Sequence, residues 1–279
     1  MVPLRRVAPS ILLVSLLALG AACATGRGPG RAPAGARATL DVAGTPRTYR
    51  QHVPAGLDRA RPVALLLVFH GAGSDADDIA RGSGFDALAD AVPMIVVYPE
   101  ALGGRFDVAS TDSADLRFVD ALVADLKGRH AIDPRRVFAS GFSNGAAFCY
   151  RLAASRPGLV AAIAPVAGYL PPVGATGEPV PLLHVHGSAD RRVAAPALVG
   201  GPSDPVATWA RRNGATRGPT VADVAGMDGL SVRGATYTGS TPRADAILWL
   251  VDGEDHTWPG GPAGPVSRGL LDFLRAHAR

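Results

Sequence analysis

A serine stands between small residues at a predicted turn in the middle of the chain. Ser143 is the central residue of the motif Gly141-Phe142-Ser143-Asn144-Gly145. The apolar run 137–140 precedes this motif, and a stretch with helical character, 146–153, follows it. The order strand, G-x-S-x-G, helix is typical of a nucleophile elbow, because glycines let the backbone turn sharply and lift the hydroxyl clear of the sheet. The motif therefore predicts a nucleophilic serine and acyl-transfer chemistry.

The candidate general base is His256. A serine hydroxyl needs a histidine to take its proton and a carboxylate to hold that histidine in the useful tautomer. In the α/β-hydrolase order, the acid and then the base follow the serine along the chain. His256 follows the apolar run 247–251 in a loop rich in glycine and proline. Active sites of open α/β sheets lie at the carboxyl ends of the strands, so this position favours a catalytic role over a surface histidine.

The candidate acid is Asp190, the first carboxylate after the strand-like run 181–186. Three other carboxylates lie so close to His256 in sequence that we expect them to be solvated loop charges: Asp252, Glu254 and Asp255. Two arginines, Arg191 and Arg192, follow Asp190 directly and leave open the alternative that they pair with it.

Acyl transfer also needs backbone donors for the developing oxyanion. We expect one to be the N–H of Asn144, after the nucleophile, and the other the N–H of Ala72, in a glycine-rich loop that follows the apolar run 63–69.

His70 and His186 each end a strand before a glycine and are expected to brace loops near the site, whereas His184 is expected to pack. Three residues are expected at the substrate pocket: His70, Phe106 and Trp258.

The elements around these residues predict an α/β-hydrolase fold, with a mostly parallel central sheet and helices on both faces. An antiparallel hairpin, 38–42 and 47–53, opens it. Further strands are expected at 63–69, 94–98, 137–140, 161–166, 181–186, 220–224, 230–238 and 247–251, and helices at 75–90, 112–130, 146–153, 204–213 and 266–276. Only 14 residues separate the runs 161–166 and 181–186, so no cap domain is expected there.

The N-terminus predicts export. Arg5 and Arg6 precede a short apolar run, 11–19, and small residues follow, which is the layout of a signal peptide over residues 1–23. The run is shorter than the roughly 20 residues that a spanning helix needs. Residues 24–38, rich in Gly, Ala, Arg and Pro, are expected to be a flexible linker, and 39–279 the catalytic domain.

The end of the signal leaves two possibilities. Leu19-Gly20-Ala21-Ala22-Cys23 resembles a bacterial lipobox, in which Cys23 would be lipidated and would anchor the protein to a membrane, although Gly20 stands where leucine is usual. The alternative is ordinary cleavage after Ala22 or Ala24, which would release a soluble protein. Either outcome places the protein in the cell envelope or outside the cell.

Composition excludes several other classes of function. The net charge is +4, and the basic residues are scattered rather than clustered, so no nucleic-acid partner is expected. The chain has two cysteines and no H-E-x-x-H motif, so neither a metal site nor a cofactor is expected. Cys149, on the stretch after the elbow, is expected to be a buried packing residue. We expect a monomer.

Taken together, these motifs resemble the polyhydroxybutyrate depolymerase-like esterases, with the related feruloyl and acetylxylan esterases. The resemblance covers about Thr39 to the C-terminus. It depends on the order of Leu67-Val68-Phe69-His70-Gly71, Val97-Tyr98-Pro99, Asp133-Pro134-Arg135-Arg136-Val137, the elbow, His186-Gly187-Ser188-Ala189-Asp190, Trp209-Ala210-Arg211-Arg212-Asn213-Gly214 and His256-Thr257-Trp258-Pro259-Gly260-Gly261.

The resemblance carries the family's triad onto Ser143, Asp190 and His256. Two departures concern the pocket: Phe106 stands in a loop where members often have tryptophan, and Ala146-Ala147 stand where Gly-Met is common. The resemblance implies a carboxylic ester hydrolase acting on short acyl or polymer-linked esters of polyhydroxyalkanoate, feruloyl or acetyl type. The alternatives are a serine peptidase of the prolyl oligopeptidase type, which usually needs a gating domain, and an inactive cell-envelope binding protein, which the complete triad disfavours.

Overall fold

The computed structural model describes residues 35–279 except 59, 171–177 and 202. The predicted signal peptide 1–23, the lipidation candidate Cys23 and most of the predicted linker 24–38 lie outside the described residues.

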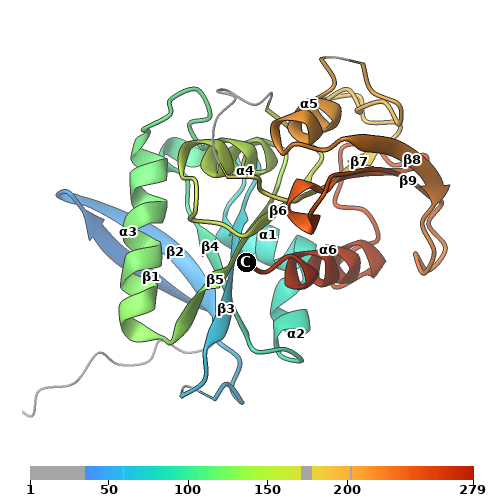
Figure 1. Cartoon of the computed structure of the whole chain (residues 1–279). Coiled ribbons are helices and arrows are strands. Elements are labelled where there is room, and N and C mark those ends of the chain that lie inside the picture. Colours follow the sequence, from blue (N-terminus) through green and yellow to red (C-terminus); the bar gives the residue numbers. More distant parts are fainter. Residues whose placement is uncertain (1–34, 59, 171–177, 202) are drawn as a thin grey trace, which may run out of the picture. The chain divides into compact units, whose positions relative to one another are not determined.

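The described residues form one sheet of ten strands (Figure 1). Six central strands run parallel in the order β4-β3-β5-β6-β7-β10, and an antiparallel pair extends each side: β2 and β1 beyond β4, and β9 and β8 beyond β10. The bounds are β1 Ala36–Val42, β2 Thr45–His52, β3 Val63–Phe69, β4 Met94–Pro99, β5 Ile132–Phe142, β6 Ala162–Val166, β7 Leu182–Gly187, β8 Arg217–Asp223, β9 Val232–Thr238 and β10 Ala246–Val251. This arrangement confirms the predicted fold class and the opening hairpin.

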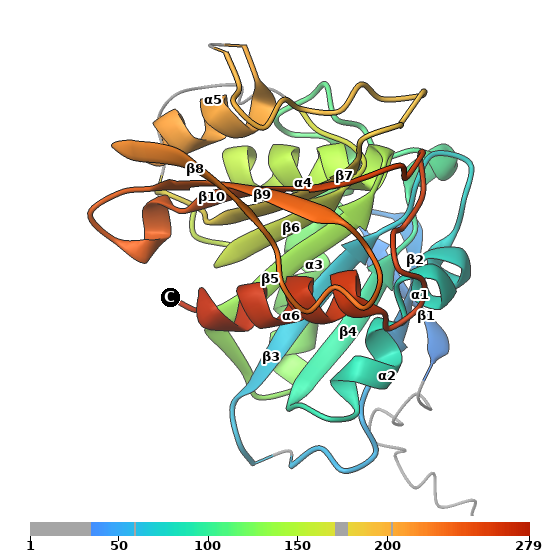
Figure 2. The ribbon, with the colours of Figure 1, turned by 90° about the vertical axis from the view of Figure 1, so that its right-hand side faces the viewer.

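Helices cover both faces of the sheet. On one face α3 Ala114–Arg129, α4 Asn144–Ser155 and α5 Pro205–Arg212 contribute to one apolar cluster. On the other face α1 Ala76–Ser83, α2 Phe85–Ala89 and α6 Pro265–Ala276 contribute to a second, and Figure 2 shows α6 lying across the sheet from this side. Each of these six helices contacts a strand, so none of them forms a separate cap.

Strand β3 is apolar throughout because both of its faces are buried. Leu65, Leu67 and Phe69 belong to the cluster on one face, whereas Leu66 and Val68 belong to the cluster on the other. Alternate side chains of a strand point to opposite faces, so a strand covered on both sides must be apolar at every position. Strand β3 ends at Phe69, and the loop that begins with His70 lies at this carboxyl end of the strand.

Several boundaries differ from the sequence-based expectation, and two of the differences have a clear cause or consequence. The helix expected at 75–90 is two helices, because Gly84 between them adopts φ 66° and a Cβ on it would lie 2.2 Å from the backbone nitrogen of Ala263. Only glycine permits this close approach with a left-handed backbone. Strand β1 begins at Ala36, which pairs with Gln51, so the last three residues of the expected linker are part of the sheet.

Candidate active site

Ser143 lies at a strained turn between β5 and α4. Its φ of 53° and ψ of −113° are outside the regions that a residue with a side chain normally adopts. The chain around it is packed too closely for larger residues: a Cβ on Gly145 would lie 2.2 Å from the Phe69 carbonyl oxygen. The Ser143 N–H donates to the Val166 carbonyl at 2.9 Å, which fixes the turn to the neighbouring strand β6. This is the geometry of a nucleophile elbow.

The three residues expected to form a triad are in hydrogen-bond contact. His256 Nε2 lies 2.9 Å from Ser143 Oγ, and His256 Nδ1 lies 2.8 Å from Asp190 Oδ2. Asp190 follows β7 and His256 follows β10, and these two strands are parallel neighbours, so their carboxyl ends lie together. A Cβ on Gly187 would lie 2.2 Å from the Glu254 carbonyl oxygen, which shows how closely the two loops approach.

The Asp190 carboxylate accepts bonds at both oxygens. Oδ1 accepts from the N–H groups of Arg192 at 2.8 Å and Val193 at 2.9 Å, while Oδ2 faces His256 and His186 at 2.8 Å and 3.0 Å. Burial alone would raise the pKa of Asp190, but the hydrogen bonds from Val193, His256 and Arg192 bring it below its ordinary value. The carboxylate is therefore ionised at neutral pH and can hold the imidazole of His256.

The rival carboxylates are engaged elsewhere. Asp255 pairs with Arg191, with Arg191 Nη2 2.6 Å from Asp255 Oδ2, and the hydrogen bonds from Arg191 lower the pKa of Asp255 to about 2. Glu254 accepts from the Thr257 hydroxyl at 2.8 Å, and Asp252 accepts from the Ser188 hydroxyl at 3.2 Å. The alternative in which Arg191 neutralises Asp190 is thus replaced by a pair between Arg191 and Asp255.

Asn144, an expected oxyanion donor, begins helix α4. The first N–H groups of a helix have no acceptor within it, so the Asn144 N–H is available to a ligand. The Asn144 side chain has a separate task. Its Oδ1 accepts from the Phe106 N–H at 2.8 Å and its Nδ2 donates to the Phe106 carbonyl at 3.1 Å, which ties the loop after β4 to the elbow.

Ala72, the other expected donor, lies in a loop against the elbow. A Cβ on the preceding Gly71 would lie 3.6 Å from Ser143 Cβ. His70 Nε2 accepts from the Ala101 N–H at 3.1 Å, so its proton is on Nδ1, which donates to the Gly71 carbonyl at 2.7 Å. Because that carbonyl and the Ala72 N–H belong to one peptide group, His70 fixes the direction in which the Ala72 N–H points. His70 therefore braces this loop, which is one of the two roles that the sequence analysis expected of it.

The three residues expected at the substrate pocket each pack against other side chains. His70 and Phe106 are 0% and 1% exposed, and the Phe106 ring stacks on Phe148 with centroids 4.8 Å apart. Trp258 packs edge-on against Phe85 and donates from Nε1 to Ser267 at 2.9 Å, on the α6 side of the sheet. Trp258 is partly buried, and none of these contacts decides which side chains a substrate would touch, so the pocket role expected of the three residues stays a prediction.

A cavity of about 420 Å³ opens beside the imidazole ring of His256. Its lining is formed by Arg191, Arg192, Asp255, His256 and Thr257. In the sequence analysis, Arg191 and Arg192 entered only as possible ion-pair partners of Asp190. Their sequence position directly after the acid, on the loop that follows β7, was the signal that could have placed them at the mouth of the site.

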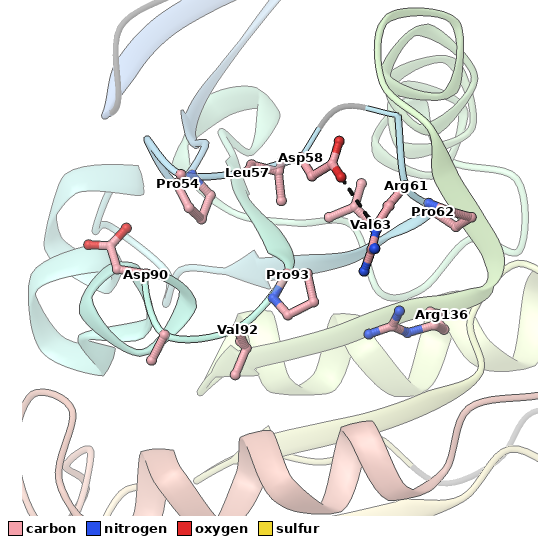
Figure 3. Close-up of a pocket in the computed structure, with 12 residues that line it drawn as sticks. Pro54, Leu57, Asp58, Arg61, Pro62, Val63, Asp90, Val92, Pro93 and Arg136 are labelled. Atoms are coloured by element: carbon pink, nitrogen blue, oxygen red, sulfur yellow. Dashed lines mark ion pairs between the residues drawn. The ribbon is translucent and has the colours of Figure 1, made fainter.

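A larger cavity of about 650 Å³ lies at the opposite edge of the sheet (Figure 3). Val63 at the start of β3, Pro93 before β4 and Arg136 near the start of β5 line it. Arg61 and Asp58 on its rim form an ion pair at 3.4 Å. Its lining residues include no nucleophile paired with a base, so volume alone does not identify the reacting site.

Two further kinds of feature are absent from the described part of the chain. Within it, no three His, Cys, Asp or Glu side chains gather as possible metal ligands, and none of its helices has the length and apolar character to cross a membrane. Cys149 is fully buried and burial raises its thiol pKa well above the ordinary value, in agreement with the expected packing role.

Comparison with known proteins identifies the family. Residues 47–174 match the family model described as Esterase PHB depolymerase. The protein named "Putative esterase NocK" from Nocardia uniformis subsp. tsuyamanensis is 34% identical over 266 residues, which cover 83% of this chain and 76% of that protein. The chain belongs to the PHB depolymerase family of esterases. This confirms the resemblance noted in its motifs and makes the protein a carboxylic ester hydrolase.

Further relatives support the assignment of this esterase. Feruloyl esterase D of Neurospora crassa is 29% identical over 262 residues, 88% of this chain and 87% of that protein. Among solved structures, an acetyl xylan esterase from Aspergillus awamori superposes with a TM-score of 0.64 at 18% identity, over 81% of this chain and 95% of that one. The structural likeness confirms the α/β-hydrolase fold.

Proposed function

We propose that the esterase cleaves its substrates through a Ser143–His256–Asp190 triad and a covalent acyl-enzyme. The observation that carries the proposal is the unbroken hydrogen-bond series from Ser143 Oγ through both nitrogens of His256 to Asp190 Oδ2. Each residue has the neighbours that its role requires: a strained elbow for the serine, an ionised carboxylate for the histidine, and available N–H groups nearby.

In the acylation step, His256 Nε2 takes the Ser143 proton as Oγ attacks the ester carbonyl. The N–H groups of Asn144 and Ala72 donate to the oxyanion that forms, and donors of this kind each lower the barrier by about 3–4 kcal/mol. Asp190 stabilises the imidazolium. When the tetrahedral intermediate collapses, His256 gives the proton to the departing alcohol oxygen, and the acyl group stays on Ser143.

In the deacylation step, His256 removes a proton from water, and the resulting hydroxide attacks the acyl carbonyl. The same two N–H groups hold the second oxyanion. Collapse releases the carboxylic acid and returns the proton from His256 to Ser143 Oγ. The proposed reaction consumes one water and uses no cofactor.

We propose short acyl or polymer-linked esters as substrates, of acetyl, feruloyl or hydroxyalkanoate type. The cavity beside His256 is open and polar, with two arginines at its mouth, and suits an ester that protrudes from a larger molecule. The names of the feruloyl and acetyl xylan esterase relatives favour the same group of substrates. We also propose that residues 1–23 direct export, with Cys23 as a lipidation site and the residues from 24 up to the start of β1 at Ala36 as the tether.

Hydrolysis assays with the purified chain test the proposal. We expect p-nitrophenyl acetate or butyrate, or methyl ferulate, to be hydrolysed, and Ser143→Ala to lose that activity. Ser140→Ala is a matched control, because the Ser140 hydroxyl, on β5, is buried and donates at 2.6 Å to the Ala164 carbonyl on the neighbouring strand β6. Hydrolysis of aryl-peptide amides without ester hydrolysis would instead indicate a peptidase, and inactivity on every substrate would indicate a binding protein.

A further inference from the structure

The hydrogen bonds of the triad do not end at Asp190. His186 Nε2 lies 3.0 Å from Asp190 Oδ2, the same oxygen that faces His256. His186 Nδ1 lies 2.9 Å from His184 Nε2, and His184 Nδ1 lies 2.9 Å from the Tyr150 hydroxyl. A single series of polar contacts thus leads from Ser143, through His256 and Asp190, to two histidines on β7 and a tyrosine on helix α4.

The position of each proton in this series follows from its acceptors. His186 Nε2 faces two oxygens that can only accept, Asp190 Oδ2 and the Val193 carbonyl at 2.9 Å, so it must carry the proton. In a neutral ring Nδ1 then accepts, and His184 Nε2 must donate to it. His184 Nδ1 therefore accepts from the Tyr150 hydroxyl. All donors point the same way, from Tyr150 toward Asp190.

The surroundings keep this arrangement neutral. His184 and His186 are each 0% exposed and Tyr150 is 1% exposed. Burial, followed by the charge that His186 would carry, lowers the pKa of His184 well below its ordinary value, and burial lowers that of His186. Burial also raises the pKa of the Tyr150 hydroxyl well above its usual value, so this group stays a donor.

We propose that Tyr150, His184 and His186 are positioning residues for the triad, and that their ordered donors hold the Asp190 carboxylate in place through Oδ2. The inference rests on the proposed triad. The His186 N–H shares Oδ2 with the His256 N–H, so it fixes the direction of that oxygen and offsets part of its charge. Oδ2 then binds a proton less tightly, which favours retention of the proton on His256 Nδ1 during the reaction.

Loss of the His186 donor has two consequences. The carboxylate can rotate, so fewer encounters have the reactive geometry and kcat falls while KM changes little. The more negative Oδ2 also stabilises the protonated imidazole, which cannot act as a base. The acid limb of the kcat/KM profile therefore moves to higher pH. A purely structural role for these residues would lower stability without moving that limb.

The test compares four variants of the full chain on p-nitrophenyl butyrate. His186→Leu should lower kcat by roughly tenfold to a hundredfold, the range typical of partners that orient a reacting group. His186→Gln keeps a donor and an acceptor and should restore part of the loss. Tyr150→Phe keeps the ring against Trp209 and should lower kcat by about threefold to tenfold, as expected for one neutral hydrogen bond. Tyr49→Phe is the matched control.

The control removes another buried tyrosine hydroxyl, which accepts from Arg129 Nη2 at 2.7 Å and is not connected to the triad. It should leave kcat and the pH profile unchanged. The proposal is overturned if Tyr150→Phe and His186→Gln match the control in both readouts, or if His186→Gln falls as far as His186→Leu with an unmoved acid limb. Should His186→Leu not fold, Tyr150→Phe decides the matter. Activity remaining in Ser143→Ala would instead overturn the proposed function.

Discussion

Asn144 and Phe106 exchange two hydrogen bonds, from the Phe106 N–H to Asn144 Oδ1 and from Asn144 Nδ2 to the Phe106 carbonyl. Asn144 is 8% exposed and Phe106 is 1% exposed, so water does not compete for either bond. Besides the oxyanion-donor role proposed for its backbone N–H, Asn144 thus has a structural task. Its side chain holds the loop whose Phe106 ring packs against His70.

The side chain of Asn144 should therefore matter although its N–H is retained in any variant. Asn144→Ala leaves two buried groups of Phe106 without partners and releases the loop that supports the oxyanion donors. We expect kcat for a p-nitrophenyl ester to fall by about tenfold or more. Unfolding in denaturant should show a loss of about 1–3 kcal/mol.

Asn213 provides a matched control for that variant. It also exchanges two buried hydrogen bonds with a backbone, accepting from the Val180 N–H at 3.1 Å and donating to the Val180 carbonyl at 2.7 Å. Asn213→Ala should lower stability by a similar amount and leave kcat near the wild-type value. Equal effects of both variants on kcat would show that Asn144 acts through stability alone.

A buried ion pair holds the same loop from its other end. Arg47 Nη2 lies 2.6 Å from Asp115 Oδ1, and both side chains are 4% exposed. Asp115 also accepts from the N–H groups of Leu102 at 3.1 Å and Asp107 at 2.9 Å. Arg47→Met would leave this carboxylate buried without its cation, so we expect the free energy of unfolding to fall by about 3–5 kcal/mol.

Denaturant titration measures that loss, and hydrogen exchange should show faster exchange at the loop amides. Arg37→Met is the comparison, because Arg37 pairs with Asp77 and Glu100 at 2.8 Å but is 48% exposed. Its effect should be far smaller, since water and salt screen exposed pairs. If the two variants lose the same stability, the buried pair does not hold the loop.

Asp255 should contribute stability to the folded protein at neutral pH, and this contribution should be lost in acid. Its pKa falls from 3.8 to about 2 through the hydrogen bonds of Arg191, so the folded state binds the proton more weakly than the unfolded state. A lowered pKa gives stability that is complete above the unfolded value and is lost as the pH falls through the folded value. The Tm difference between wild type and Asp255→Asn should be constant above pH 3.8 and should shrink between pH 3.8 and about 2. A difference that stays constant throughout this interval would contradict the assignment.

The meeting of the three residues of the proposed triad could be predicted because the rules that bring them together are simple. Ser143, Asp190 and His256 each follow a strand of one parallel sheet, and parallel strands present their carboxyl ends at one edge. The order of the three residues along the chain and the apolar runs before them were sufficient. The same reasoning placed Ala72 in the loop against the elbow.

The contacts behind the triad could not be predicted in this way. His184 lies on β7 and Tyr150 on α4, and their meeting depends on how that helix is rotated against the sheet. Sequence periodicity shows that both positions are buried but not which buried groups touch. The burial of the aromatic residues expected at the pocket was equally hidden, because it depends on packing: Phe106 is 1% exposed, whereas Trp258 is partly buried.

Gly168 was also missed, although it shapes the elbow. It follows β6, and a Cβ at this position would lie 2.1 Å from the Ser143 carbonyl oxygen and 2.9 Å from Ser143 Cα. Backbone atoms cannot yield as a flexible side chain can. Gly168→Ala must therefore displace the turn that carries the nucleophile.

We expect Gly168→Ala to lower kcat by about a hundredfold, since a displacement of roughly 1 Å at the reacting atom has an effect of this size. Binding of a substrate away from the hydroxyl should be less affected, so KM should change less than kcat. Gly128→Ala is the control: it lies in helix α3 with nothing within 4 Å of the added Cβ, and alanine favours the helix. Wild-type kcat in Gly168→Ala, with the control also unchanged, would show that the elbow tolerates the added methyl group and that its backbone geometry is not set by this contact.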